Sequence, residues 1–121
     1  MNTIVREKCD LLIKNKDTLR QVFRLDGDMM MLAGSSFYVG IDVEANADKI
    51  KYCEQILKKN TKMLSEFRGN VRIPVLCKMA IAKEPQDYLI SVQRIVGQMK
   101  HLRWMNGEYK VLAAMIIQDH E

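Results

Sequence analysis

The sequence lacks a long hydrophobic run and has few residues that force turns. No apolar stretch approaches the roughly 18 residues that would indicate a membrane-spanning helix. Six glycines and two prolines in 121 residues are few for a turn-rich β-sandwich and suit a helical protein. The first ten residues carry charged side chains where a secretory signal needs an apolar stretch. We therefore expect a cytoplasmic protein that does not enter the membrane.

The motifs of common enzymes and metal sites are also missing. No glycine-rich phosphate loop, nucleophile elbow, H-E-x-x-H or Glu-x-x-His pattern occurs. Asp26-Gly27-Asp28 resembles the start of a calcium loop but lacks its ligand spacing, so a turn between helices is the better interpretation. We expect no enzyme activity, no catalytic residue, no cofactor and no metal site.

Cysteine is scarce, and its three copies are too far apart to form a redox or zinc motif. Cys9, Cys53 and Cys77 lie on or beside apolar helical positions, and no C-x-x-C occurs. This pattern predicts buried, reduced thiols. The two histidines, His101 and His120, are not placed beside any cysteine by the sequence, so a cysteine nucleophile is not expected.

The positive charge is modest and dispersed. The formal net charge is +4, and the densest basic group is interrupted by Asp48 and Glu54. A solvated helix face explains this pattern, whereas nucleic-acid binders concentrate basic residues on one face. A phosphate-contacting surface remains the alternative. The basic group comprises Lys49, Lys51, Lys58, Lys59 and Lys62.

Apolar residues recur at helical spacing along the whole chain. They predict helices over about 3–24, 29–39, 71–82, 85–105 and 108–118, and one that begins between 45 and 48 and ends near 60. They also predict a kink or short extra helix at 63–67 and an extended connection from 40 to 44. The fold class is all-α, with five to six helices in a single domain over 1–121. The helices form antiparallel hairpins, stacked either as a small solenoid-like repeat or as an irregular helical bundle.

Several residues predict where these helices begin and end. Pro74 and Pro85 fit only in the first turn of a helix, and Gly107 should lie in the turn before the last one. Thr3 and Asp28 are the expected N-caps. The other expectations are a left-handed Gly27 and a kink or half-exposed middle of the first helix at Asn15-Lys16.

Three short apolar helices alternate with longer amphipathic ones, and this alternation suggests a repeat. Leu32, Leu76 and Leu112 occupy matching points and are expected to be buried. The last helix is apolar on most sides. Three alternatives remain for what buries this helix. They are the first helix, a further part of a longer protein of which this chain is the N-terminal part, and another subunit through self-association.

The most distinctive segment is Asn60–Asn70, with the sequence NTKMLSEFRGN. Thr61 could cap a new helix and Ser65 the turn that follows, while Arg68 beside Gly69 could bind carbonyls at a helix end or an acidic partner. The structural interpretation is a satisfied corner between helices. The functional interpretation makes Ser65, Phe67, Arg68 and Gly69 candidate interaction residues.

This segment, an apolar helix after it, Glu84-Pro85 and the closing Glu108–Ala114 together resemble an uncharacterised bacterial family. The resemblance is to the N-terminal part of domain of unknown function 4003, whose members are longer helical proteins with an N-T-x-x-x-S-x-F-R-G-like segment. It covers residues 28–118 and implies no activity, substrate or catalytic residue.

The function expected from the sequence is therefore non-catalytic. We expect a bacterial cytoplasmic interaction or scaffold module whose partner is a protein or peptide rather than nucleic acid. The alternative is a nucleic-acid-associated regulator that uses the modest basic excess.

Overall fold

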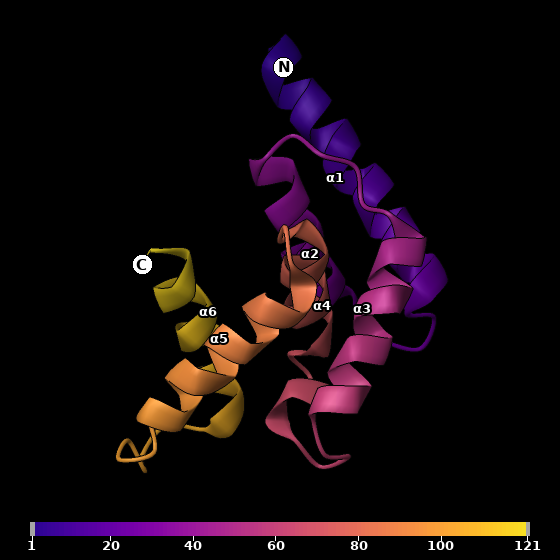
Figure 1. The fold of residues 1–121 in the computed structure, drawn as a ribbon. Helices are drawn as coiled ribbons and strands as arrows, with labels where there is room; N and C mark the ends of the chain where they lie inside the picture. Colours follow the sequence, from indigo (N-terminus) through magenta and orange to yellow (C-terminus); the bar gives the residue numbers. More distant parts are fainter. Residues whose placement is uncertain (1, 121) are drawn as a thin grey trace.

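The computed structural model describes residues 2–120, and within them it contains helices and no strand (Figure 1). The all-α prediction is therefore confirmed. In chain order the elements are α1 (Thr3–Val22), α2 (Asp28–Gly40), α3 (Ala47–Asn60), the 3₁₀ helix η1 (Glu66–Arg68), α4 (Arg72–Ile81), α5 (Pro85–Gln98) and α6 (Gly107–Asp119).

The two prolines mark helix starts, as predicted. Pro85 is the first residue of α5 and Pro74 lies in the first turn of α4, where a missing amide donor removes no helical hydrogen bond. Gly107 was predicted for the turn before α6. It is instead the first residue of that helix, because the Asn106 side chain accepts from the Glu108 amide and caps it.

The end of α5 lies earlier than the sequence pattern indicates. Met99, Leu102 and Met105 continue the apolar spacing, but they lie in successive turns after Gln98. The amides of these three residues bond to carbonyls three positions back. Turns of this kind repeat every three residues and keep one side apolar, so the pattern imitates a longer helix.

Three predictions about the first two helices are wrong. Asn2, not Thr3, caps α1, and its side chain accepts from the Val5 amide. Gly27, not Asp28, is the N-cap of α2, and its φ of −74° is not left-handed. Among the described residues, Asp42 is the one non-glycine with a positive φ, at 58°.

Asn15 does not interrupt α1, which is one helix from Thr3 to Val22. Its side chain is fully buried rather than half-exposed. Nδ2 donates to the Val43 carbonyl at 3.1 Å, and Oδ1 accepts from the Ala45 amide at 2.8 Å. Both polar ends of the buried amide are thus satisfied, and they fasten the connection between α2 and α3 onto α1. The prediction of an extended chain from 40 to 44 is wrong for its first part, because Gly40 ends α2 and Ile41 and Asp42 form a turn.

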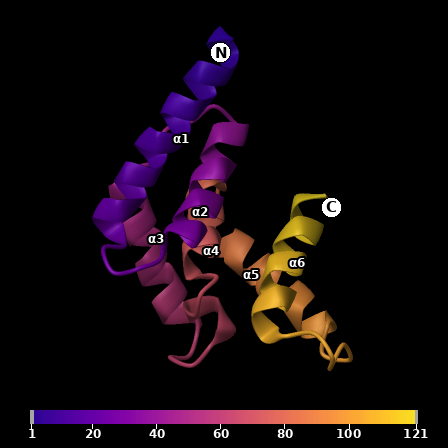
Figure 2. The same ribbon diagram turned by 180° about the vertical axis from the view of Figure 1, so that it is seen from behind.

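The helices pack as two unequal groups. α1 and α2 form a hairpin, α2 packs along α4, and α4 packs on α3, while α5 and α6 form a second hairpin away from α1 (Figures 1 and 2). One core takes apolar side chains from all six helices and η1. Because α6 packs on α5 and η1 rather than along α4, the alternation does not extend as a regular repeat.

The expected burial of the three matching leucines fails at the first one. Leu76 is fully buried and Leu112 partly buried, but 43% of Leu32 is exposed. The helical repeat turns Met31 and Ser35 inward instead, and both are fully buried. The apolar last helix is not covered by α1, and Ile116 and Ile117 at its end are exposed.

Two of the three cysteines are buried and one is exposed. Cys53 and Cys77 are buried as expected, whereas Cys9 is exposed. Cys9 lies in the N-terminal half of α1, which projects beyond the other helices in both views (Figures 1 and 2). No helix in the described part of the chain is long and apolar enough to cross a membrane.

Candidate functional site

The segment 60–70, which we call the 60–70 corner, is built around the Arg68 guanidinium. Nη2 donates to the carbonyls of Lys58 at 2.6 Å and Thr61 at 2.9 Å, and Nε donates to the Thr61 hydroxyl at 2.9 Å. Carbonyls in the last turn of a helix have no partner within that helix. Arg68 therefore satisfies the end of α3, which confirms the predicted interhelical corner.

Two more candidates have structural roles in the corner. The Ser65 hydroxyl accepts from the Phe67 amide at 3.2 Å and caps η1, as predicted. Phe67 is 5% exposed and belongs to the core. Thr61, predicted to start a helix, instead follows the last residue of α3 and donates to the Leu57 carbonyl at 2.6 Å.

Gly69 lets the corner lie close against the start of α6. A Cβ added at Gly69 would collide with the Glu108 carboxylate, and one added at Gly107 would collide with the Glu66 side chain. Glu108 Oε1 also accepts from the Asn70 amide at 3.2 Å. Two glycines facing two glutamates thus allow an approach that larger residues would block.

The corner borders two surface hollows. The larger, with a volume of about 610 Å³, lies between the corner and the start of α6 and includes Ser65, Arg68 and Gly69 in its lining. The smaller, of about 400 Å³, lies on the α3 and α5 side. Leu64 borders both hollows. The structure therefore brings Ser65, Arg68 and Gly69 to the larger hollow, while the largely buried Phe67 lines the smaller one.

Met63 and Leu64 are the exposed residues that the sequence interpretation did not select. They are 81% and 96% exposed, although their spacing had indicated a continuing helix. The signal that could have found them is Ser65, because a residue that caps the next turn leaves the two before it outside any helix.

The lysines of α3 do not share one face. Lys51 and Lys58 are seven positions apart and lie on the outer face, while Lys49 lies one turn before the buried Cys53. The Lys58 ammonium is 3.7 Å from Glu54 Oε1. The lysines of α3 therefore do not form one contiguous basic face.

Burial holds two of the three cysteines in the protonated form. Burial raises the pKa of Cys53 to about 11, and burial together with the charge of Cys53 raises that of Cys77 to about 12, so both remain thiols at neutral pH. No group of three or more His, Cys, Asp or Glu side chains within residues 2–120 could hold a metal ion.

The fold and the corner define an all-α protein with a structured corner that follows the N-T-x-x-x-S-x-F-R-G pattern. The chain matches the family model described as "Protein of unknown function (DUF4003)" over residues 15–121 and belongs to that family. The match begins at Asn15, the residue that fastens α1 to the α2–α3 connection. No curated protein and no solved structure matches the chain.

Proposed function

We propose that this chain is a non-catalytic interaction module that binds a protein or peptide at the 60–70 corner. The observation that carries the proposal is the pair Met63 and Leu64, two large apolar side chains at 81% and 96% exposure. Single exposed apolar residues are common. Here the two are adjacent and stand on a base that Arg68 and Glu108 fix by hydrogen bonds, so little order has to be gained on binding.

The hollow beside these residues indicates the chemistry of the partner. Glu66 and Glu108 line it, and the Glu66 carboxylate has no ion-pair partner among the described residues. A peptide with an apolar side chain next to Lys or Arg would meet both the apolar pair and the free carboxylate. The proposed site of action is the bacterial cytoplasm, which suits the buried thiols.

Selection from a random peptide library against the immobilised protein tests this proposal. We expect enriched peptides to combine an apolar with a basic residue, and Leu64→Ser to weaken their binding about tenfold, the effect of losing one buried apolar anchor. Leu25→Ser is the matched control, because Leu25 is also fully exposed but lies in another turn. Absence of enrichment, or equal loss in both variants, would contradict the proposal.

The nucleic-acid alternative makes a different prediction. Only weak DNA binding, with a Kd of about 10⁻⁴–10⁻⁶ M at physiological salt, is expected from a few phosphate contacts. Titration of duplex and single-stranded DNA at two salt concentrations measures this directly. Nanomolar, sequence-selective binding would replace the peptide-binding proposal with the alternative.

A further inference from the structure

Two consecutive turns over residues 99–105, which we call the 99–105 turns, form most of the connection between α5 and α6. In each turn the amide of the last residue donates to the carbonyl of the first, at 3.0 Å and 3.1 Å. The central residues are Lys100 and His101 in the first turn and Arg103 and Trp104 in the second, and all four are exposed. Each turn thus presents a basic residue followed by an aromatic ring.

The positive charge of these turns is not balanced within their own part of the chain. From Tyr88 to Gly107 the sequence contains no Asp or Glu. Neither Lys100 nor Arg103 forms an ion pair within residues 2–120. Beside them the Trp104 side chain is 79% exposed. Arg and Trp are the residue types that most often dominate binding at interfaces, so this surface fits a partner with acidic groups.

The 99–105 turns continue directly into the hollow of the 60–70 corner. Asn106 follows the second turn and lines that hollow together with Gly107. The Cα atoms of Trp104 and Asn106 are no more than about 7.6 Å apart, because two residues cannot span more. The turns and the corner also lie at the same end of the molecule in both views (Figures 1 and 2). One extended peptide can therefore contact both.

The combined surface carries opposite charges on its two parts. Glu66 and Glu108 line the corner hollow, whereas Lys100 and Arg103 lie in the turns. A polyanion of uniform charge, such as single-stranded nucleic acid or an anionic membrane, would meet the carboxylates as well as the cations. A peptide that is basic in one part and acidic in another matches both parts. Charge complementarity therefore favours a peptide of mixed charge.

We propose that the partner peptide of the 60–70 corner carries an acidic segment that binds the 99–105 turns. The inference rests on the proposed function and adds the polarity of the partner. The acidic side chains pair with Lys100 and Arg103, and a neighbouring part of the peptide packs on the Trp104 indole. The apolar and basic residues of the same peptide lie at the corner.

The peptides selected from the random library test this proposal. We expect them to contain acidic residues besides the apolar and basic pair. Arg103→Gln should weaken their binding about two- to fivefold at low salt, the usual effect of losing one exposed ion pair. Lys51→Gln removes the same charge from the outer face of α3 and is the matched control.

The aromatic contact is tested separately. Trp104→Ala should weaken binding at least about fivefold, the effect expected when an aromatic anchor is lost. Tyr52→Ala is the matched control, because Tyr52 is 57% exposed but lies on α3. Trp104 is also the single tryptophan of the chain, so its fluorescence should change when the selected peptides bind. Unchanged fluorescence together with unchanged binding in Trp104→Ala would overturn the proposal.

Charge reversal distinguishes a direct contact from a general effect of net charge. Arg103→Glu should weaken binding of a selected peptide more than Arg103→Gln does. Replacing one acidic residue of the peptide by Lys should then restore part of the loss, because the pair is re-formed with its charges exchanged. No recovery at any acidic position of the peptide would overturn the contact.

The proposed function and this inference fail in different ways. Selected peptides without acidic residues, or equal losses in Arg103→Gln and Lys51→Gln, would overturn the inference and leave the corner site. Acidic peptides whose binding depends on Arg103 but not on Leu64 would overturn the corner site and keep the acidic segment on the turns. Tighter binding of oligothymidine or of anionic phospholipid vesicles than of the selected peptides would overturn the peptide partner.

Discussion

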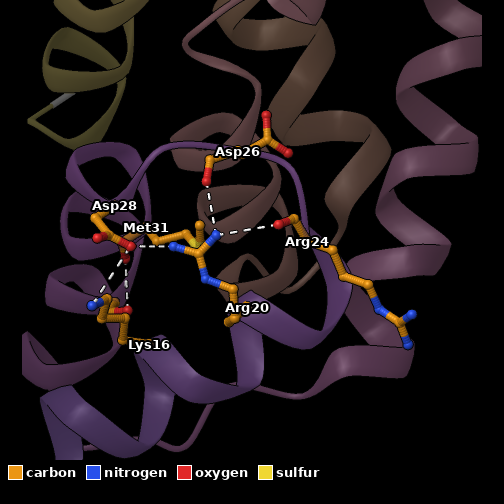
Figure 3. Close-up of polar contacts among 7 residues, drawn as sticks. Lys16, Arg20, Arg24, Asp26, Asp28 and Met31 are labelled. Carbon is orange, nitrogen blue, oxygen red and sulfur yellow. Dashed lines mark hydrogen bonds and ion pairs between the residues drawn. The ribbon is translucent and has the colours of Figure 1, made fainter.

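Two chain reversals in this molecule are organised by arginine, and they differ in what the arginine binds. In the turn at residues 23–28, Arg20 donates to the carbonyls of Arg24 and Asp26 and pairs with the Asp28 carboxylate (Figure 3). Lys16 Nζ lies 3.7 Å from the same carboxylate. In the 60–70 corner, every acceptor of Arg68 is a neutral oxygen.

Each reversal is also joined to the rest of the protein by a second set of contacts. These contacts are ion pairs in the 23–28 turn and a hydrogen bond to a backbone amide in the corner. Arg72 joins the 23–28 turn to the body of the protein by ion pairs, at 2.9 Å to Asp26 and 3.5 Å to Glu54. The 60–70 corner is joined to α6 by Glu108 and the Asn70 amide. Salt screens contacts between partly exposed charges but not hydrogen bonds to neutral groups. Salt should therefore affect the corner less than the 23–28 turn, which agrees with the binding surface that we propose there.

The largest difference between the two reversals should appear when each arginine is removed. Arg68→Ala should lower the free energy of unfolding by about 1.5–3 kcal/mol, because the carbonyls at the end of α3 lose their donor. Arg20→Ala should cost about 1 kcal/mol, since its contacts are more exposed. Urea unfolding followed by circular dichroism measures both.

Arg68→Lys serves as the control for charge. A lysine keeps the charge but cannot present the planar fork that reaches Lys58 and Thr61 together. Most of the loss should therefore remain. Full recovery of stability in Arg68→Lys would mean that the corner depends on charge, as the 23–28 turn does.

Alanine substitutions at glycine should give the next largest difference in stability between the two reversals. Gly69→Ala and Gly107→Ala should each cost about 1 kcal/mol, because the added methyl displaces Glu108 or Glu66. At Gly27 no atom beyond the glycine and its two chain neighbours lies within 4 Å of the position of a Cβ. A lost N-cap preference and a less flexible unfolded chain offset each other there, so Gly27→Ala should stay within about 0.5 kcal/mol. Equal losses at all three positions would contradict the close approach described for the corner.

Salt should change the stability contribution of the ion pairs at the 23–28 turn but not that of the Arg68 hydrogen bonds in the corner. Asp26→Asn should cost about 0.5–1 kcal/mol at low ionic strength and less than half of that in about 1 M NaCl, because the pair with Arg72 is partly exposed. The loss in Arg68→Ala should not change with salt. Urea unfolding at both salt concentrations tests this, and a salt-dependent Arg68→Ala would remove the distinction.

The smallest effect on stability is expected at the two exposed leucines. Leu25→Ser and Leu64→Ser should each change the free energy of unfolding by no more than about 0.5 kcal/mol, since neither side chain is buried. Thermal unfolding compares them. A clear loss of stability in Leu64→Ser alone would mean that Leu64 packs within the fold rather than awaiting a partner.

The sequence predicted best where one residue type allows one local structure. Pro74 and Pro85 located two helix starts, and Ser65 located a cap. Arg68 beside Gly69 offered two interpretations, carbonyls at a helix end or an acidic partner, and the structure shows the carbonyls. These features depend on neighbours in the chain.

What the sequence could not give depends on contacts between distant segments. In the sequence, Asn15 is a polar residue that interrupts an apolar helix face. It is buried because its side chain bonds to the backbone of residues 43–45, which the sequence does not show to be near. Met31 and Leu32 are adjacent and both apolar, so the packing of α2 on α4 decides which one is buried. The hollow at the corner likewise needs Glu108, which lies 38 positions after Asn70.

The bonds of Asn15 also have a consequence for the motions of the native protein. The Ala45 amide lies outside any helix, yet it donates to a fully buried oxygen. In hydrogen exchange it should therefore behave like an amide of a core helix and exchange only when α1 leaves the core. Because Asn15 also binds the Val43 carbonyl, release of α1 and loosening of the α2–α3 connection should be one opening event.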